Sequence, residues 1–247
     1  MSDPDRVEVV ADAAALAEAA ARHAVADLEA AVEANGSATW VLTGGTTPAA
    51  AYRRLAARDL RAGIEWDRIR VAMGDERSVP VGHPDSNWGQ AAAALLDHVP
   101  IPEANQLRPR VELPGPEAAA DYERQLAALP KTKAGWPRLD VAWLGMGEDG
   151  HCLSLFPGHP EVEITDRLAV DVHDSPKPPP DRLSLTLPAL RGTGCCAIVA
   201  AGGGKAEVIA RARAGDDSLP VTRAVKEITE AGGTVRWLLD RDAAAKL

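Results

Sequence analysis

The segment Ala38-Thr-Trp-Val-Leu-Thr-Gly-Gly-Thr-Thr-Pro48 decides the fold class. Its first six residues form an apolar run typical of a strand that is buried on both faces, and a helical pattern follows from about Ala49. A strand joined to a helix by a short glycine-containing turn is one unit of a parallel sheet. The segment therefore predicts an α/β fold.

The alternation of apolar runs and helical patterns continues on both sides of this segment. We expect strands at residues 6–10, 38–43, 69–73, 140–144, 168–172, 197–201 and 235–239. We expect helices at residues 12–35, from about 49, and at 88–96, 117–129, 205–214 and 221–231. Because parallel strands need crossover connections, the pattern predicts a Rossmann-like, three-layer α/β/α fold with a mostly parallel central sheet. No linker or internal repeat divides the sequence, so residues 1–247 are expected to form a single domain.

The composition is that of a globular protein with an excess of acidic residues. Hydrophobic residues make up 46% of the 247 residues, and 36 Asp and Glu against 27 Lys and Arg give a formal net charge of −9. This balance argues against nucleic acid or an anionic membrane as the main partner, since both require a basic surface. It still allows an anionic small molecule in a local positive pocket.

Compartment and cofactors are limited by several further features of the sequence. No apolar run reaches the roughly 18 residues of a membrane span, and the first residues lack the apolar region of a signal peptide. The three cysteines form neither a disulfide framework nor a zinc spacing. We therefore expect a soluble, cytoplasmic protein without a metal or nucleotide cofactor. The sequence does not determine the oligomeric state, and a monomer is our expectation.

Ligands in open parallel sheets bind at the carboxyl ends of the strands, so the loops after the strands are the candidate sites. The first such loop contains Gly44, Gly45, Thr46 and Thr47 and leads into a helix. Its glycines allow close approach of the backbone, and the helix N-terminus offers unpaired N–H groups that suit a phosphate monoester. The loop is neither a Walker loop nor a dinucleotide fingerprint, and an ordinary strand-to-helix turn is the alternative interpretation.

The second loop begins with Asp75-Glu76-Arg77 and continues to Asn87. Acidic, basic and amide side chains at the end of a strand are suited to binding hydroxyl groups and stabilising developing negative charge. The alternative is a solvated run of surface charges.

The third loop runs from Leu144 to Gly158 and begins Leu144-Gly-Met-Gly-Glu-Asp-Gly-His-Cys152, with three glycines among six consecutive residues. The carboxylate of Asp149 is placed to orient the His151 imidazole and to favour its protonated form, which would make His151 a base near neutral pH. Cys152 offers a thiol nucleophile as an alternative, although its apolar neighbour Leu153 equally favours an inward-packed cysteine.

The fourth candidate is a pair of segments. Residues 175–182, Ser-Pro-Lys-Pro-Pro-Pro-Asp-Arg, contain prolines that stiffen the chain around Lys177 and Arg182. In the other segment, three glycines precede Lys205 at the start of a helix, where a cation would complement a bound phosphate. The alternative interpretation is that Lys205 is a solvated lysine in the first turn.

Taken in order along the chain, these loops resemble the 6-phosphogluconolactonase family. The most specific stretch is Gly-x-Gly-Glu-Asp-Gly-His-x-x-Ser-Leu-Phe-Pro, from Gly145 to Pro157. The other similar segments are residues 42–48, 74–77, 85–87, 178–182 and 204–205, with a family-like ending from residue 237.

The resemblance implies a fold shared with glucosamine-6-phosphate deaminase and ribose-5-phosphate isomerase. It also implies an enzyme of the oxidative pentose phosphate pathway that hydrolyses 6-phospho-D-glucono-1,5-lactone. The sugar phosphate lactone is then the partner of the site. In this interpretation, the phosphate is held by Gly44, Gly45, Thr46, Thr47, Lys205 and Arg182.

The resemblance assigns the chemistry to the remaining site residues. His151 would activate water for attack on C1, with Asp149 orienting its ring. Arg77 would stabilise the tetrahedral oxyanion. Asp75 and Asn87 would hold Arg77 or the sugar hydroxyls.

Two other functions remain open at this stage. Glucosamine-6-phosphate deaminase has a similar histidine loop, but it continues into Asn-Glu-Pro where this chain has Leu-Phe156-Pro. Deaminases also tend to have Asp-Glu-Tyr where this chain has Asp-Glu-Arg77, so both positions favour the lactonase. A sugar-phosphate sensor without catalysis is the third alternative, and the acidic charge together with the lack of room for a separate DNA-binding unit argues against it.

Overall fold

A seven-stranded sheet runs through the structure, which is a computed structural model that describes residues 4–247. All neighbouring strands in this sheet are parallel. Their spatial order is β1 (Asp5–Val10), β10 (Thr234–Asp240), β9 (Thr193–Ala200), β6 (Leu139–Leu144), β2 (Ala38–Leu42), β3 (Ile69–Met73) and β5 (Gln106–Leu107). Residues 1–3, where both the expected domain and the polar start of the chain begin, lie outside the described residues.

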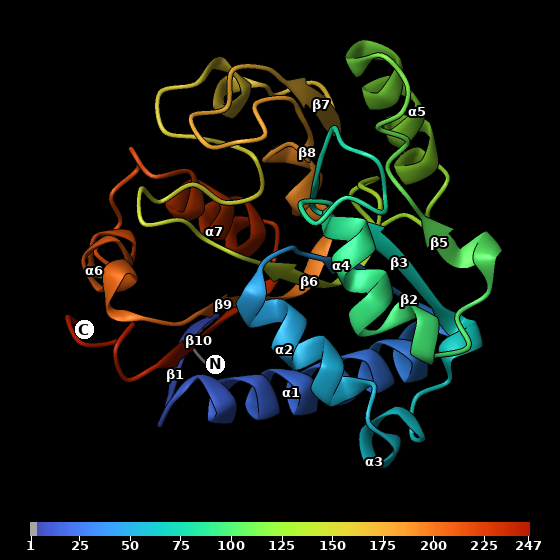
Figure 1. Ribbon diagram of the computed structural model, residues 1–247, viewed down its shortest axis with the longest axis horizontal. Helices are drawn as coiled ribbons and strands as arrows, with labels where there is room; N and C mark the ends of the chain where they lie inside the picture. The colour runs from blue at the N-terminus through green and yellow to red at the C-terminus, as the bar shows by residue number, and fades with distance from the viewer. Residues whose placement is uncertain (1–3) are drawn as a thin grey trace.

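Helices cover both faces of the sheet (Figure 1). The α-helices are α1 (Ala13–Asn35), α2 (Thr46–Leu55), α3 (Arg58–Arg61), α4 (Asn87–Ala94), α5 (Gly115–Ala127), α6 (Ala206–Arg213) and α7 (Pro220–Glu230). Short 3-10 turns are η1 (Trp66–Arg68), η2 (Leu96–His98), η3 (Glu103–Asn105), η4 (Pro160–Glu163), η5 (Pro188–Gly192) and η6 (Gly203–Lys205). The expected three-layer α/β/α fold is thereby confirmed.

The period of two along each strand divides the core between the two helical layers. In β2, Trp40 and Leu42 pack with residues of α1, α2 and α4, whereas Val41 packs with residues of α5, α6 and α7. In β6, Trp143 belongs to the first layer and Leu144 to the second. Because both faces are covered, these strands are uniformly apolar, which is why the sequence shows them as continuous apolar runs.

A second, antiparallel sheet lies beside the carboxyl end of the first, and its strands are ordered β4 (Asp75–Arg77), β8 (Arg182–Leu185) and β7 (Ala169–Val172). This corrects two details of the sequence interpretation. The strand expected at residues 168–172 forms, but in this small sheet, and the Asp-Glu-Arg run is a strand rather than a loop. Only Gly74 separates β4 from β3, and its N–H and C=O bond to Leu42 and Leu185, one in each sheet.

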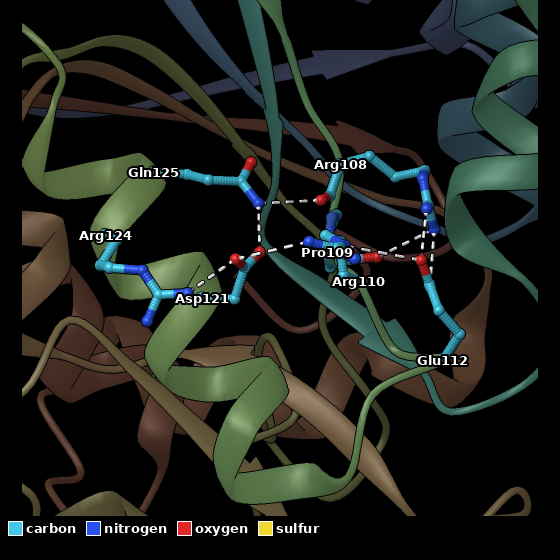
Figure 2. Close-up of polar contacts among 7 residues, drawn as sticks. All are labelled: Arg108, Pro109, Arg110, Glu112, Asp121, Arg124 and Gln125. Atoms are coloured by element: carbon cyan, nitrogen blue, oxygen red, sulfur yellow. Dashed lines mark hydrogen bonds and ion pairs between the residues drawn. The ribbon is translucent and has the colours of Figure 1, made fainter.

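The connection between β5 and α5 is fixed by a group of charged side chains (Figure 2). Arg108 pairs with Glu112 at 2.7 Å, and Gln125 of α5 donates to the Arg108 carbonyl at 3.3 Å and to Asp121 at 2.8 Å. These contacts hold α5 against the edge of the sheet. The side chain of Tyr122, on α5, reaches the end of β3.

Among residues 4–247, no helix is long and apolar enough to cross a membrane.

Candidate active site

A cavity of about 190 Å³ opens at the carboxyl ends of β2, β3, β6 and β9. It lies where parallel α/β sheets usually bind ligands. The structure brings all but one of the expected site residues to its wall: Gly44, Gly45, Thr46, Thr47, Asp75, Arg77, Asn87, His151, Arg182 and Lys205. The exception, Asp149, lies directly behind His151.

The N-terminus of α2 forms one wall of the cavity. Its N-cap is Gly45, at φ +112°, a conformation that side-chain-bearing residues rarely adopt, and no side chain caps the helix. Thr46 and Thr47 are the first two helical residues, so their N–H groups have no acceptor within the helix. This end therefore offers free donors and a positive dipole end to an anion in the cavity.

Gly44 is required by a close contact with α4. A Cβ atom at this position would lie 1.8 Å from Oδ1 of Asn87. Asn87 is anchored by its amide nitrogen, which donates to the Asp75 carbonyl at 2.8 Å. Its Oδ1 is buried and, within the described part of the chain, has no hydrogen-bond partner. This oxygen is an unused acceptor in the cavity wall.

Two tyrosines fix the strand ends beneath the site. The Tyr52 hydroxyl accepts from the N–H of Thr43 at 2.9 Å and donates to its carbonyl at 3.0 Å. The Tyr122 hydroxyl makes the same pair of bonds with Met73, at 2.7 and 2.6 Å. Each hydroxyl thus makes the backbone hydrogen bonds that a neighbouring strand would make if it extended to that point. The sequence analysis did not identify this role.

Glu76 organises the loop between β4 and α4. It is only 2% exposed and accepts hydrogen bonds from the N–H groups of Arg77, Asn87 and Trp88, each at 2.7 Å, and from the Ser86 hydroxyl at 3.0 Å. Burial raises the pKa of Glu76, and these bonds oppose that effect. The sequence analysis missed this residue because three of its partners, Ser86, Asn87 and Trp88, lie ten to twelve positions away at the start of α4, where no local pattern signals them.

Arg77 reaches the cavity from the end of β4. Its Nη1 donates to the Asp85 carbonyl at 2.8 Å. Its Nε is buried and finds no partner among residues 4–247. The guanidinium is therefore fixed on one side and retains a free donor on another, which suits a group that binds developing negative charge. The contact with Asp85 takes the place of the expected contacts with Asp75 or Asn87.

His151 and Asp149 form a hydrogen-bonded pair. Nδ1 of His151 lies 2.5 Å from Oδ1 of Asp149. Burial acts to raise the pKa of Asp149, but the hydrogen bond and charge of His151 and the charge of Lys177 outweigh it and hold that pKa far below its usual range. An ionised carboxylate only accepts, so the bonded Nδ1 carries the proton and Nε2 is left free to act as a base.

Gly147 in this loop allows the side chains of His151 and Asp149 to lie close to each other and to the backbone. A Cβ at Gly147 would lie 2.2 Å from the His151 ring and 2.4 Å from Asp149. Any side chain there would displace both groups.

The His151 imidazole packs against Phe156 with the two rings tilted by 40°. The two ring centres are 4.6 Å apart, and Phe156 is 1% exposed. The Arg182 guanidinium lies 5.5 Å from the centre of the same phenyl ring. Phe156 thus contacts both the histidine and the buried cation, at the position where the deaminase pattern has an acid.

Arg182 is largely engaged with the protein itself. It is 4% exposed, and it donates from Nε to the Pro179 carbonyl at 3.1 Å and from Nη2 to the Lys177 carbonyl at 2.8 Å. Burial lowers its pKa, an effect opposed by the charge of Asp75. Asp75 in turn accepts from the Ser154 hydroxyl at 2.6 Å.

Lys205 lies half-buried in the cavity wall at the end of η6. Burial lowers its pKa, and the charge of Glu148 opposes the shift. Arg182 is occupied by carbonyl groups, whereas the Lys205 side chain lies in the same cavity wall as the α2 N-terminus.

Cys152 is excluded as a nucleophile. Its side chain is fully buried, and burial raises its pKa to about 12, so the thiolate is not populated at neutral pH. In the part of the chain that the structure describes, no group of three or more His, Cys, Asp or Glu side chains could hold a metal ion.

The fold and the cavity define an α/β protein that presents an uncapped helix N-terminus and a histidine–aspartate pair at one edge of a parallel sheet. The family model described as glucosamine-6-phosphate isomerases/6-phosphogluconolactonase matches residues 11–237. The chain belongs to this family.

Similar proteins cover nearly the whole chain. A 6-phosphogluconolactonase of Streptomyces coelicolor is 40% identical, with 100% of this chain and 96% of that protein covered. A 6-phosphogluconolactonase of Mycobacterium tuberculosis is 42% identical, with 98% of each covered.

Solved structures support the fold. A 6-phosphogluconolactonase from Trypanosoma brucei has a TM-score of 0.86 at 28% identity, covering 98% of each chain. A monomeric glucosamine-6-phosphate deaminase has a TM-score of 0.78, covering 98% of this chain and 100% of that one, but at 19% identity it shows the shared fold alone.

Proposed function

We propose that the chain hydrolyses 6-phospho-D-glucono-1,5-lactone to 6-phospho-D-gluconate in the oxidative pentose phosphate pathway. It is a carboxylic ester hydrolase, as its relatives' names indicate. The observation that carries the proposal is the position of His151, which shares one small cavity with the open N-terminus of α2. A base and a phosphate cradle at a fixed separation are what a phosphorylated lactone needs.

The phosphate is the handle that brings the lactone carbon into register. The N–H groups and hydroxyls of Thr46 and Thr47 bind it, and Gly44 and Gly45 allow the backbone to approach. Lys205 supplies the positive charge. Arg182 contributes mainly by holding the adjacent loop. Binding energy from this remote group is then available to orient the reacting carbonyl.

The chemical step begins at Nε2 of His151. It takes a proton from water as the oxygen attacks C1, and the resulting tetrahedral oxyanion is stabilised by Arg77. The intermediate collapses, the bond between C1 and the ring oxygen breaks, and the imidazolium returns the proton to that oxygen. Asp149 keeps Nδ1 protonated throughout. Asn87 Oδ1 and the Asp75 carboxylate accept hydrogen bonds from sugar hydroxyls.

The deaminase alternative lacks the acid that its ring-opening step requires. Phe156 occupies that position and covers one face of the His151 ring. A sensor without catalysis would have no use for a paired and oriented base.

The wider description of the enzyme follows from the same residues. Because every site residue comes from one chain, from segments at the carboxyl ends of the central strands and from β4 and β8 of the small sheet, we infer a single-domain enzyme whose catalytic unit is the monomer. The three free cysteines are typical of a reducing compartment and favour the cytoplasm. Neither nucleic acid nor membrane enters the proposal.

The test is the loss of freshly generated 6-phosphogluconolactone after subtraction of spontaneous hydrolysis. Glucosamine 6-phosphate is assayed in parallel for ammonia release. Fast lactone loss without ammonia supports the proposal, whereas ammonia release would favour the deaminase. Tight 6-phosphogluconate binding with neither activity would favour a sensor.

A further inference from the structure

The proline-rich segment at residues 175–180 is held in one conformation beside the cavity. The Ser175 N–H donates to the Pro180 carbonyl at 3.0 Å, and the Ser175 hydroxyl donates to the Lys177 carbonyl at 2.9 Å. The same carbonyl accepts from the buried Arg182 at 2.8 Å. Because prolines flank Lys177 on both sides, its backbone has little freedom left.

This backbone aims the Lys177 side chain at the catalytic pair. Its Nζ lies 3.7 Å from Oδ2 of Asp149. The other oxygen of that carboxylate, Oδ1, is the one bonded to His151. The aspartate is thus contacted from opposite sides, by the histidine on one oxygen and by the lysine on the other.

We propose that Lys177 is a positioning residue that holds Asp149 from the side away from His151 and limits the attraction of that carboxylate for the imidazolium. An unopposed carboxylate would bind the protonated imidazole too strongly and reduce the free base available near neutral pH. The lysine keeps the aspartate fixed while partly neutralising it. This role rests on the proposed function of His151 as a base, but its electrostatic effect can be measured without turnover.

Among the described residues, the other charged groups near His151 and Asp149 do not form an ion pair with Asp149 as Lys177 does. Glu148 is on the same loop and lies near Gly204, and the charges of Glu148 and Lys177 act on the pKa of Lys205 in opposite directions. Arg182 lies over the Phe156 ring at 5.5 Å from its centre, and His159 contacts that ring at 5.7 Å. Across residues 4–247, Lys177 and His151 are the two side chains that form an ion pair with Asp149.

The competing interpretation is an incidental surface ion pair. Lys177 is 46% exposed and Asp149 36%, and exposed pairs contribute little to stability. Stability measurements therefore cannot separate the two interpretations. A titration of the histidine can, because a lysine whose charge is screened by solvent would leave the His151 midpoint unmoved.

The test compares Lys177→Met with Lys177→Arg, which keeps the charge. Each protein is labelled with ¹⁵N-histidine and titrated by NMR, with the His151 signal assigned through His151→Asn. Removing a nearby cation stabilises the imidazolium, so Lys177→Met should move the His151 midpoint upward by about 0.5 pH units. Lys177→Arg should restore the original midpoint. Lys133→Met, which changes a lysine at the opposite edge of the sheet, should leave the midpoint unmoved.

The pH profile of lactone hydrolysis gives the second measurement. The acidic limb of kcat/KM should shift upward by the same amount in Lys177→Met, so activity falls most below neutral pH. An unmoved midpoint, or a raised KM with an unchanged pH profile, would overturn the proposal. A shifted midpoint in a protein without lactonase activity would instead refute the proposed function and leave the Lys177 contact standing.

Discussion

The two edges of the central sheet carry very different hollows. At the amino ends of the strands, a groove of about 930 Å³ lies between α1, α7 and the segment before β6. The cavity at the carboxyl ends is about 190 Å³. The candidate catalytic residues nevertheless line the smaller cavity, not the larger groove.

The difference lies in how the charged groups are used. In the groove, Arg138 pairs with Asp140 at 3.0 Å, and Arg191 pairs with Glu227 at 2.5 Å while stacking on Trp136. In the small cavity, the charged Arg77 side chain keeps a buried Nε without a partner and Asn87 Oδ1 is also unpaired, whereas in the groove the unpaired buried atom is the neutral Thr193 hydroxyl, among the residues described. A charged group that the fold leaves with an unpaired donor, rather than volume, marks the site.

The strongest test of this contrast removes the base. His151→Asn should lower kcat by about 10²–10⁴, because a positioned general base contributes that much. Binding of 6-phosphogluconate, measured by calorimetry, should hardly change. Turnover near that of the unmodified protein would remove His151 from the mechanism.

The second largest effect on turnover is expected from Arg77, whose Nε has no partner among the described residues. Arg77→Gln is expected to lower kcat about 100-fold, corresponding to about 3 kcal/mol of lost oxyanion stabilisation. Initial rates at saturating lactone provide the measurement. If KM rises instead while kcat is unchanged, Arg77 binds the ground state and the oxyanion has another partner.

A smaller effect is expected from removing Lys205, the residue proposed to bind the phosphate. Lys205→Ala should raise KM for the phosphorylated lactone about tenfold, the loss typical of one charge-assisted hydrogen bond. Unphosphorylated glucono-1,5-lactone is the control, since both proteins should hydrolyse it equally well. Equal losses on the two lactones would show that Lys205 does not bind the phosphate.

The smallest effect should come from the large groove. Cys195 lines it and is partly exposed, whereas Cys152 and Cys196 are buried. Alkylation with a maleimide should therefore modify Cys195 and fill part of the groove without changing kcat/KM. Cys195→Ser serves as the unlabelled control. A large loss of activity in the labelled protein, without a loss in Cys195→Ser, would show that the groove at the amino ends of the strands also affects catalysis.

Much of the site was predictable because its chemistry is local in sequence. The turn at Gly44–Thr47 combines glycine with a helix start, and Asp149 lies two residues from His151. The parallel sheet followed from apolar runs because strands covered on both faces leave that pattern.

Longer-range contacts were not predictable in this way. An apolar pattern reports that a strand is buried but not which strand pairs with it, so residues 168–172 were expected in the wrong sheet. The roles of Glu76 and Lys177 depend on partners that only the folded chain brings close. Phe156 was recognised as a difference from the deaminase, but its contact with His151 was not.

The paired tyrosines have a consequence for the motions of the site. The amides of Thr43 and Met73 are held by hydroxyls from α2 and α5, so they can exchange with solvent deuterium only when those helices separate from the sheet. The floor of the cavity should therefore belong to the slowly exchanging part of the molecule. Its geometry would then persist until the global unfolding of the protein.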